Sequence, residues 1–112
     1  MQDEIRTYLF DILQAAKDIT AFTQDLTHAG YLADAKTQAA VERKFEIIGE
    51  ALNRIKRVDR SLVMTIPDHA RIISFRNIIC DGYDIVNPEL VWDVVRNHLP
   101  ALERVVQDLL SR

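Results

Sequence analysis

The sequence is poor in several residue types, and each scarcity excludes a class of protein. Its 112 residues include one cysteine, three glycines and three prolines. A single cysteine excludes an internal disulfide, and with it a small scaffold stapled by disulfides. Few glycines and prolines, with no low-complexity run, argue against a disordered or linker-rich chain. The composition therefore predicts a compact, helix-rich fold.

Long apolar runs and an excess of positive charge are also missing. Charged residues interrupt every apolar stretch well before the roughly 20 residues that a membrane-spanning helix needs. The first residues, MQDEIRTYLF, lack the basic start and apolar core of a signal peptide, so we expect a cytoplasmic protein without a membrane partner. The formal net charge of -3 provides no global attraction for nucleic acid, so any RNA contact would need a local patch.

The apolar residues are enough for one modest core, and their spacing predicts helices. They make up 48% of the chain, which we expect to form a single domain over residues 1–112. A three-and-four spacing predicts helices from Asp3 to about Leu26, from Asp34 to about Arg57, from Asp68 to Asp81, and from Pro88 onward. Four amphipathic helices with short links predict an all-α, antiparallel four-helix bundle.

Three expectations concern how these helices end. Gly30 should stop the first helix in a left-handed conformation. Residues 57–68 should form the main loop, with one short turn capped by Ser61. Pro100 has no amide to bond back to Arg96, so the last helix should be kinked near Pro100.

The second predicted helix contains a glycine and a row of acids. Gly49 in a helix interior costs about 1 kcal/mol relative to alanine, which suggests that a neighbouring helix approaches closely there. Glu42, Glu46 and Glu50 follow at intervals of four and form one row. Such a row could bind a metal, but no glutamate is followed by histidine at the spacing of helical di-metal sites. We therefore expect a mostly solvated row, without metal or cofactor.

The most unusual stretch runs from Arg76 to Tyr83 and reads RNIICDGY. It places a cation, an amide, a carboxylate and a phenol at the end of an otherwise apolar helix. A structural interpretation is an arginine covering apolar surface, a helix stop at Gly82 and a packed tyrosine. A chemical interpretation is a catalytic site, in which a fixed cation stabilises developing negative charge and a titratable group transfers protons.

Two segments resemble a known family. Residues 74–99, SFRNIICDGYDIVNPELVWDVVRNHL, resemble the C-terminal half of small HEPN-domain proteins related to the HepT toxins, and residues 40–53, AVERKFEIIGEALN, resemble their second helix. In that family an arginine, usually followed by asparagine, precedes a histidine by five positions, with a tyrosine two beyond. Arg76, Asn77 and Tyr83 match this pattern, whereas Asp81 occupies the position of the histidine.

The resemblance implies a HEPN-like bundle that acts as a metal-independent endoribonuclease toxin, usually as a homodimer whose two motifs face each other. Arg76 would bind the RNA phosphate, its neighbour Asn77 would help to position Arg76, and Asp81 would stand in place of the catalytic histidine. The partner in such type VII (HEPN/MNT) toxin-antitoxin systems is a minimal nucleotidyltransferase antitoxin, which attaches AMP to the tyrosine matched by Tyr83. AMP would add bulk and negative charge where substrate phosphate binds.

The aspartate changes the chemistry that we expect. An ordinary aspartate is ionised at neutral pH, so it can accept a proton but hardly donate one, and it repels phosphate. We therefore expect a weakened or inactive ribonuclease. His98, on the inner stripe of the last helix, should be a satisfied core residue, although it could also transfer protons. Two alternatives remain: a non-catalytic dimeric HEPN module that binds a nucleotidyltransferase or nucleotide, and a structural helical protein without a ligand.

Overall fold

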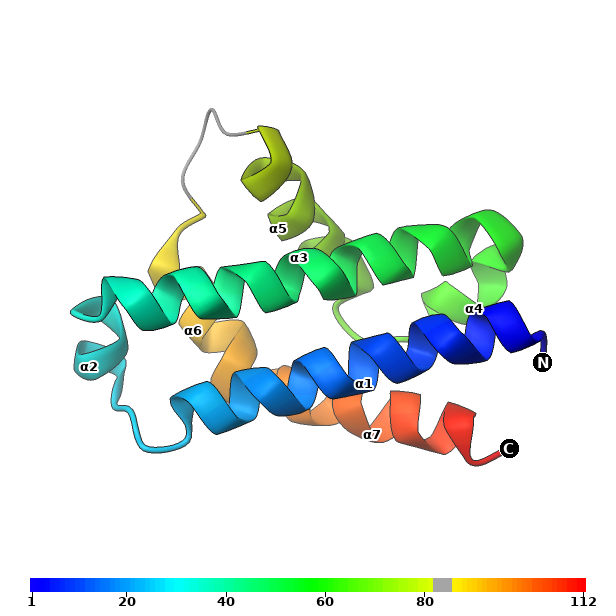
Figure 1. Cartoon of the computed structure of the whole chain (residues 1–112), viewed down its shortest axis with the longest axis horizontal. Coiled ribbons are helices and arrows are strands. Elements are labelled where there is room, and N and C mark those ends of the chain that lie inside the picture. The colour runs from blue at the N-terminus through cyan, green and yellow to red at the C-terminus, as the bar shows by residue number, and fades with distance from the viewer. Residues whose placement is uncertain (82–85) are drawn as a thin grey trace.

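The computed structural model describes residues 1–81 and 86–112, and this part of the chain is all-α, as predicted (Figure 1). Its helices are α1 (Asp3–Thr23), α2 (His28–Leu32), α3 (Ala35–Val58), α4 (Arg60–Met64), α5 (His69–Asp81), α6 (Pro88–Asn97) and α7 (Leu99–Leu110). No helix within the described residues is long and apolar enough to cross a membrane.

Two long helices form the centre of the fold. α1 and α3 run antiparallel along the length of the molecule, α5 packs on α3, and α7 packs on α1 (Figure 1). α7 runs antiparallel to α1, so both chain termini lie at the same end. With α6 and α7 taken as one interrupted helix, this arrangement is the predicted four-helix bundle. It measures 42 × 30 × 17 Å, and is thus only about two helix layers thick.

One continuous core lies between these helices. The apolar stripe of α3 is fully buried, and that of α1 is buried except at Phe22, which is 42% exposed. Phe45 of α3 meets Phe75 of α5 edge-to-face with ring centroids 5.7 Å apart. The most deeply buried side chains include Leu9, Ile12, Ile19, Ile48, Leu52, Ile72, Val94, Leu102 and Val106. The three-and-four spacing of the sequence therefore identified most of the core.

The first helix ends earlier than predicted, and Gly30 does not stop it. α1 ends at Thr23, and a separate short helix, α2, begins at His28. The reason is local capping: the hydroxyl of Thr27 accepts a hydrogen bond from the Gly30 amide at 3.0 Å, which starts a new helix where we expected only a stop. α2 then buries Tyr31, which stacks on Trp92 with ring centroids 5.2 Å apart.

Residues 57–68 are more ordered than the predicted loop. They contain the short helix α4, and its N-cap is Asp59 rather than Ser61. The Asp59 carboxylate accepts hydrogen bonds from the Leu62 amide at 3.2 Å and from the Ser61 hydroxyl at 2.8 Å. Asp68 has a positive φ of 60° and ends this connection, so α5 begins at His69.

The predicted kink near Pro100 is a complete break. α6 ends at Asn97, His98 leaves the helical conformation with φ -126°, and α7 begins at Leu99 with Pro100 in its first turn. Proline is well tolerated in a first turn because the amide that it lacks would have no partner there. Figure 1 shows α6 and α7 as two segments in different directions.

The prediction that a helix closely approaches Gly49 is confirmed, and the neighbour is α5. A Cβ added to Gly49 would lie 2.5 Å from the Cβ of Arg76 and 3.1 Å from the carbonyl oxygen of Ile72. Neither atom can move without moving the α5 backbone. Only glycine therefore allows α5 to approach α3 this closely. The contact on α5 is made by Arg76, the residue expected to bind phosphate.

Gly49→Ala should destabilise the protein by about 2 kcal/mol. Overpacking costs about 1–3 kcal/mol and should lie at the upper end here, whereas the higher helix propensity of alanine returns about 1 kcal/mol. Urea unfolding measures the difference. The matched control is Gly30→Ala, whose Cβ would meet only the side chains of Thr27 and Leu26, at 3.2 and 3.7 Å, and which should change stability by less than about 0.5 kcal/mol. Equal stability of the Gly49→Ala variant and the parent protein would contradict this packing.

Candidate functional site

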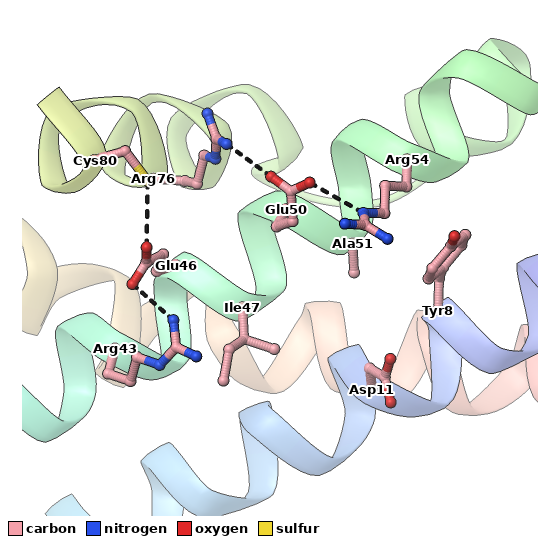
Figure 2. Close-up of a pocket in the computed structure, with 10 residues that line it drawn as sticks. All are labelled: Tyr8, Asp11, Arg43, Glu46, Ile47, Glu50, Ala51, Arg54, Arg76 and Cys80. Atoms are coloured by element: carbon pink, nitrogen blue, oxygen red, sulfur yellow. Dashed lines mark hydrogen bonds and ion pairs between the residues drawn. The ribbon is translucent and has the colours of Figure 1, made fainter.

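Arg76 lies half-buried on α5 and extends toward α3 rather than away from the bundle (Figure 2). Its Nη2 lies 2.8 Å from Oε2 of Glu50, and its Nη1 donates a 3.1 Å hydrogen bond to Oδ1 of Asn77. Its Nε is shielded from solvent and has no hydrogen-bond partner among the described residues. The guanidinium is therefore already compensated by a carboxylate of its own chain.

Glu50 is held from a second side as well. Its Oε1 accepts a 3.0 Å hydrogen bond from Nε of Arg54, and the guanidinium of Arg54 lies over the ring of Tyr8, 5.8 Å from its centroid. This hydrogen bond, together with the charge of Arg76, lowers the pKa of Glu50. A polar chain therefore runs from α5 through α3 to α1, by way of Arg76, Glu50, Arg54 and Tyr8.

A second polar link joins α3 to α5 one helical turn away. Glu46 forms an ion pair with Arg43 at 2.9 Å, and the Cys80 thiol donates a 3.2 Å hydrogen bond to its other oxygen. The bond from Arg43, then the one from Cys80, lower the pKa of Glu46. The same hydrogen bond to Glu46, followed by desolvation, raises the pKa of Cys80.

These residues line one pocket between α1, α3 and α5, with a volume of about 330 Å³ (Figure 2). Three arginines and three carboxylates face it together with Tyr8 and apolar side chains, so its charges nearly balance. The residues that line it are Tyr8, Asp11, Arg43, Glu46, Ile47, Glu50, Ala51, Arg54, Arg76 and Cys80. It could hold a polar ligand, but it is not a strongly positive phosphate site.

The other residues of the predicted site lie apart from this pocket. Asn77 is exposed beside Arg76, and Asp81 is exposed as the last residue of α5. Five positions of helix turn Asp81 about 140° away from Arg76, and no ion pair joins them among residues 1–81 and 86–112. Tyr83 and Gly82 lie outside the described residues. The described part of one chain therefore brings Arg76 and Asn77 together, but not Asp81.

Comparison with known proteins identifies the family. The model of the family described as "Ribonuclease HepT-like" matches residues 12–109. The chain belongs to the HepT-like family of HEPN proteins. This confirms the resemblance that the motif around Arg76 and the segment around Gly49 indicated.

Several relatives match almost the full length of this HepT-like chain. A Methanocaldococcus jannaschii protein named "putative RNase" is 34% identical, over 95% of the chain and 90% of the relative. A Thermococcus cleftensis protein named "probable ribonuclease HepT" is 33% identical, over 92% of the chain and 93% of the relative. A second "putative RNase" of M. jannaschii is 29% identical, over 93% of the chain and 94% of the relative. No solved structure matches the chain significantly.

In this HepT-like protein the expectation of a mostly solvated acidic row is wrong. Glu46 and Glu50 bind residues of α5, and burial raises the pKa of Glu42. Within the described residues, no group of three or more histidine, cysteine or acidic side chains is arranged to bind a metal. Sequence reasoning placed Glu50 in the row but missed its ion pair with Arg76, and it missed Arg54 and Tyr8. The neighbouring Gly49 indicated where another helix would meet the row.

His98 forms a separate polar cluster instead of lying in the core. Its ring nitrogens lie 3.1 Å from a carboxylate oxygen of Asp68 and 3.3 Å from one of Asp93, and Asp93 also lies 3.7 Å from Arg71. The expectation of a core residue was wrong because the helix breaks at His98, which turns its ring toward the start of α5. Within residues 1–81 and 86–112, the ion pairs of His98 are with Asp68 and Asp93, and none joins it to Arg76.

Glu46→Gln should make Cys80 react faster with a thiol reagent such as DTNB near pH 8. Removal of the carboxylate lowers the pKa of the thiol toward its ordinary value and so raises the fraction present as thiolate. Because that fraction changes about tenfold per pKa unit, we expect the reaction rate to increase at least about twofold. Cys80 is the only cysteine, which makes the signal unambiguous. In urea, where the contact between Cys80 and residue 46 is lost, the variant and the parent protein should react at the same rate. An unchanged rate in the folded proteins would contradict the contact.

Proposed function

We propose that this HepT-like protein is the toxin of a type VII (HEPN/MNT) toxin-antitoxin system, a metal-independent endoribonuclease whose catalysis is weakened by Asp81. The observation that supports this most directly is the family match, which includes the Arg76-Asn77 pair on α5 with an acid five positions after the arginine. Relatives named as ribonucleases are similar over nearly the whole chain. The substrate proposed is RNA.

The chemistry assigns a role to each residue of the motif. A base removes the proton of a ribose 2'-hydroxyl, whose oxygen attacks the adjacent phosphorus, and an acid protonates the 5'-oxygen that leaves. Arg76 stabilises the charge that develops on the phosphate, and Asn77 keeps its guanidinium in place. Asp81 can act as the base, but as a carboxylate it is a poor acid.

The geometry of α5 suggests a site made from two chains. Arg76 turns inward toward Glu50, whereas Asp81 is exposed at the end of the helix. Two such helices that face each other across a twofold axis would place Arg76 of one copy near position 81 of the other. We therefore propose a homodimer in which each composite site takes residues from both copies.

The charge around Arg76 supports weakened catalysis. Glu50 compensates its guanidinium at 2.8 Å. An RNA phosphate must compete with this carboxylate, and Asp81 adds a further negative charge at the end of α5. The loss of a proton donor and the added repulsion both act against cleavage.

Asp81→His should restore or strongly increase cleavage of single-stranded RNA, by about a hundredfold or more, because general acid-base catalysis contributes about 10²–10⁴-fold. The measurement compares purified chains side by side on a labelled RNA. Asp81→Asn is the matched control: it removes the negative charge without supplying a proton donor, so it should bind RNA more tightly yet cut little. Adding Arg76→Ala to the histidine variant should abolish its activity.

No gain of cleavage in the histidine variant would favour the second candidate function, a non-catalytic dimeric HEPN module that binds a nucleotidyltransferase or a nucleotide. Two observations are compatible with it: the ion pair that compensates Arg76, and the carboxylate at position 81. Cleavage by the unaltered chain at the rate of the histidine variant would instead show that Asp81 does not weaken the enzyme.

We further propose that a minimal nucleotidyltransferase is the antitoxin and attaches AMP to Tyr83. Incubation of the purified chain with a cognate nucleotidyltransferase and ATP should add the mass of one AMP group to the peptide that contains Tyr83. Tyr83→Phe should remove the modification, even though Tyr8 and Tyr31 remain. AMP on another residue, or no modification by a nucleotidyltransferase that binds the chain, would contradict the proposal.

A further inference from the structure

Glu50 stands between the proposed phosphate-binding arginine and the body of the bundle. We infer that Glu50 is a positioning residue for Arg76: it fixes the guanidinium in the orientation used for catalysis, and it weakens the attraction for RNA. This inference rests on the proposed ribonuclease function and adds a residue outside the motif on α5.

The first argument is that Glu50 holds one end of an otherwise mobile side chain. An arginine side chain that is fixed in one conformation loses rotamer entropy, so a fixed orientation requires strong partners. Arg76 has two among the described residues, Glu50 at 2.8 Å and Asn77 at 3.1 Å. Asn77 is its exposed neighbour on α5, so Glu50 is the partner that ties Arg76 to a different helix.

The second argument is that Glu50 is itself held in place. Arg54 binds its other carboxylate oxygen at 3.0 Å, and the Arg54 guanidinium lies over Tyr8 of α1. At Gly49, the residue before Glu50, α5 approaches α3 so closely that a Cβ would lie 2.5 Å from the Cβ of Arg76. The carboxylate thus stands on a long helix at the place where backbone packing fixes its distance from Arg76.

The third argument comes from charge. A carboxylate 2.8 Å from the phosphate-binding cation weakens the attraction of that cation for a phosphate. A residue that only improved RNA binding would not be an acid. Removal of the Glu50 charge should therefore have two separate effects. The looser orientation of Arg76 should slow the chemical step, and the lost repulsion should tighten RNA binding.

The kinetic test uses the Asp81→His chain, with Glu50→Gln added. We expect kcat to fall about tenfold to a hundredfold, as for other small losses of catalytic alignment, while KM falls at least about twofold. Glu50→Asp keeps the charge but is one methylene too short to reach Arg76, so it should lower kcat without lowering KM. A merely structural role would reduce the active fraction and leave KM unchanged.

Glu46→Gln is the matched control for this experiment. Glu46 lies one turn before Glu50 on α3 and carries the same charge, but its partners are Arg43 and Cys80. Its removal should leave kcat nearly unchanged. If Glu50→Gln and Glu46→Gln have equal effects on kcat, the inference about Glu50 is wrong.

A spectroscopic test separates this inference from the proposed function. In the chain as it stands, the ion pair should slow rotation of the Arg76 guanidinium, so that its nitrogens give separate signals in arginine side-chain ¹⁵N NMR. Arg76→Lys identifies these signals, and Glu50→Gln should merge them. If Asp81→His fails to cut RNA, the proposed function fails and the NMR result still decides the role of Glu50. If the Glu50→Gln variant keeps the signals separate, Glu50 does not position Arg76.

Discussion

The close approach of α5 to α3 at Gly49 is the constraint on which the rest of the site depends. Helices normally pack about 8–10 Å apart, at a distance that the side chains between them set. Here the missing side chain of Gly49 leaves room for the Cβ of Arg76, only 2.5 Å from where a Cβ on that glycine would lie. Because the backbones are so close, the guanidinium of Arg76 reaches Glu50, the next residue of α3. Packing and charge are therefore coupled at one point.

Polar contacts fix α5 at both ends. At its start, His98 at the α6–α7 break lies against Asp68 and Asp93. At its end, Arg76 binds Glu50, and Cys80 binds Glu46. Between them, Ile72 and Phe75 are buried in the core. A helix held at two ends by polar contacts and in the middle by apolar burial has a defined rotation about its axis. That rotation directs Arg76 inward and leaves Asp81 exposed.

The same contacts explain how a HepT-like fold can coexist with a site of nearly balanced charge. The net charge of the chain is -3, and the carboxylates near Arg76 reduce its local field. A free cation would attract RNA nonspecifically, because phosphate contacts dominate nucleic-acid affinity. A compensated cation attracts phosphate less strongly, but its fixed guanidinium can still act through its orientation. Under the proposed function, weak attraction for RNA and a fixed guanidinium would thus be two results of one ion pair.

The sequence by itself determined the four long apolar stripes, the close helix contact at Gly49 and the interruption near Pro100, because each follows from residue type and spacing within one segment. The motif residues Arg76, Asn77 and Asp81 were also visible in it. The short helix at Thr27, the cap at Asp59 and the partners of Arg76 were not, because each depends on which side chain meets another across a turn or between helices. Glu42, Glu46 and Glu50 look alike in a helical row. Only the tertiary structure decided that Glu50 faces Arg76, since the rotation of α5 about its own axis is set by contacts from other helices.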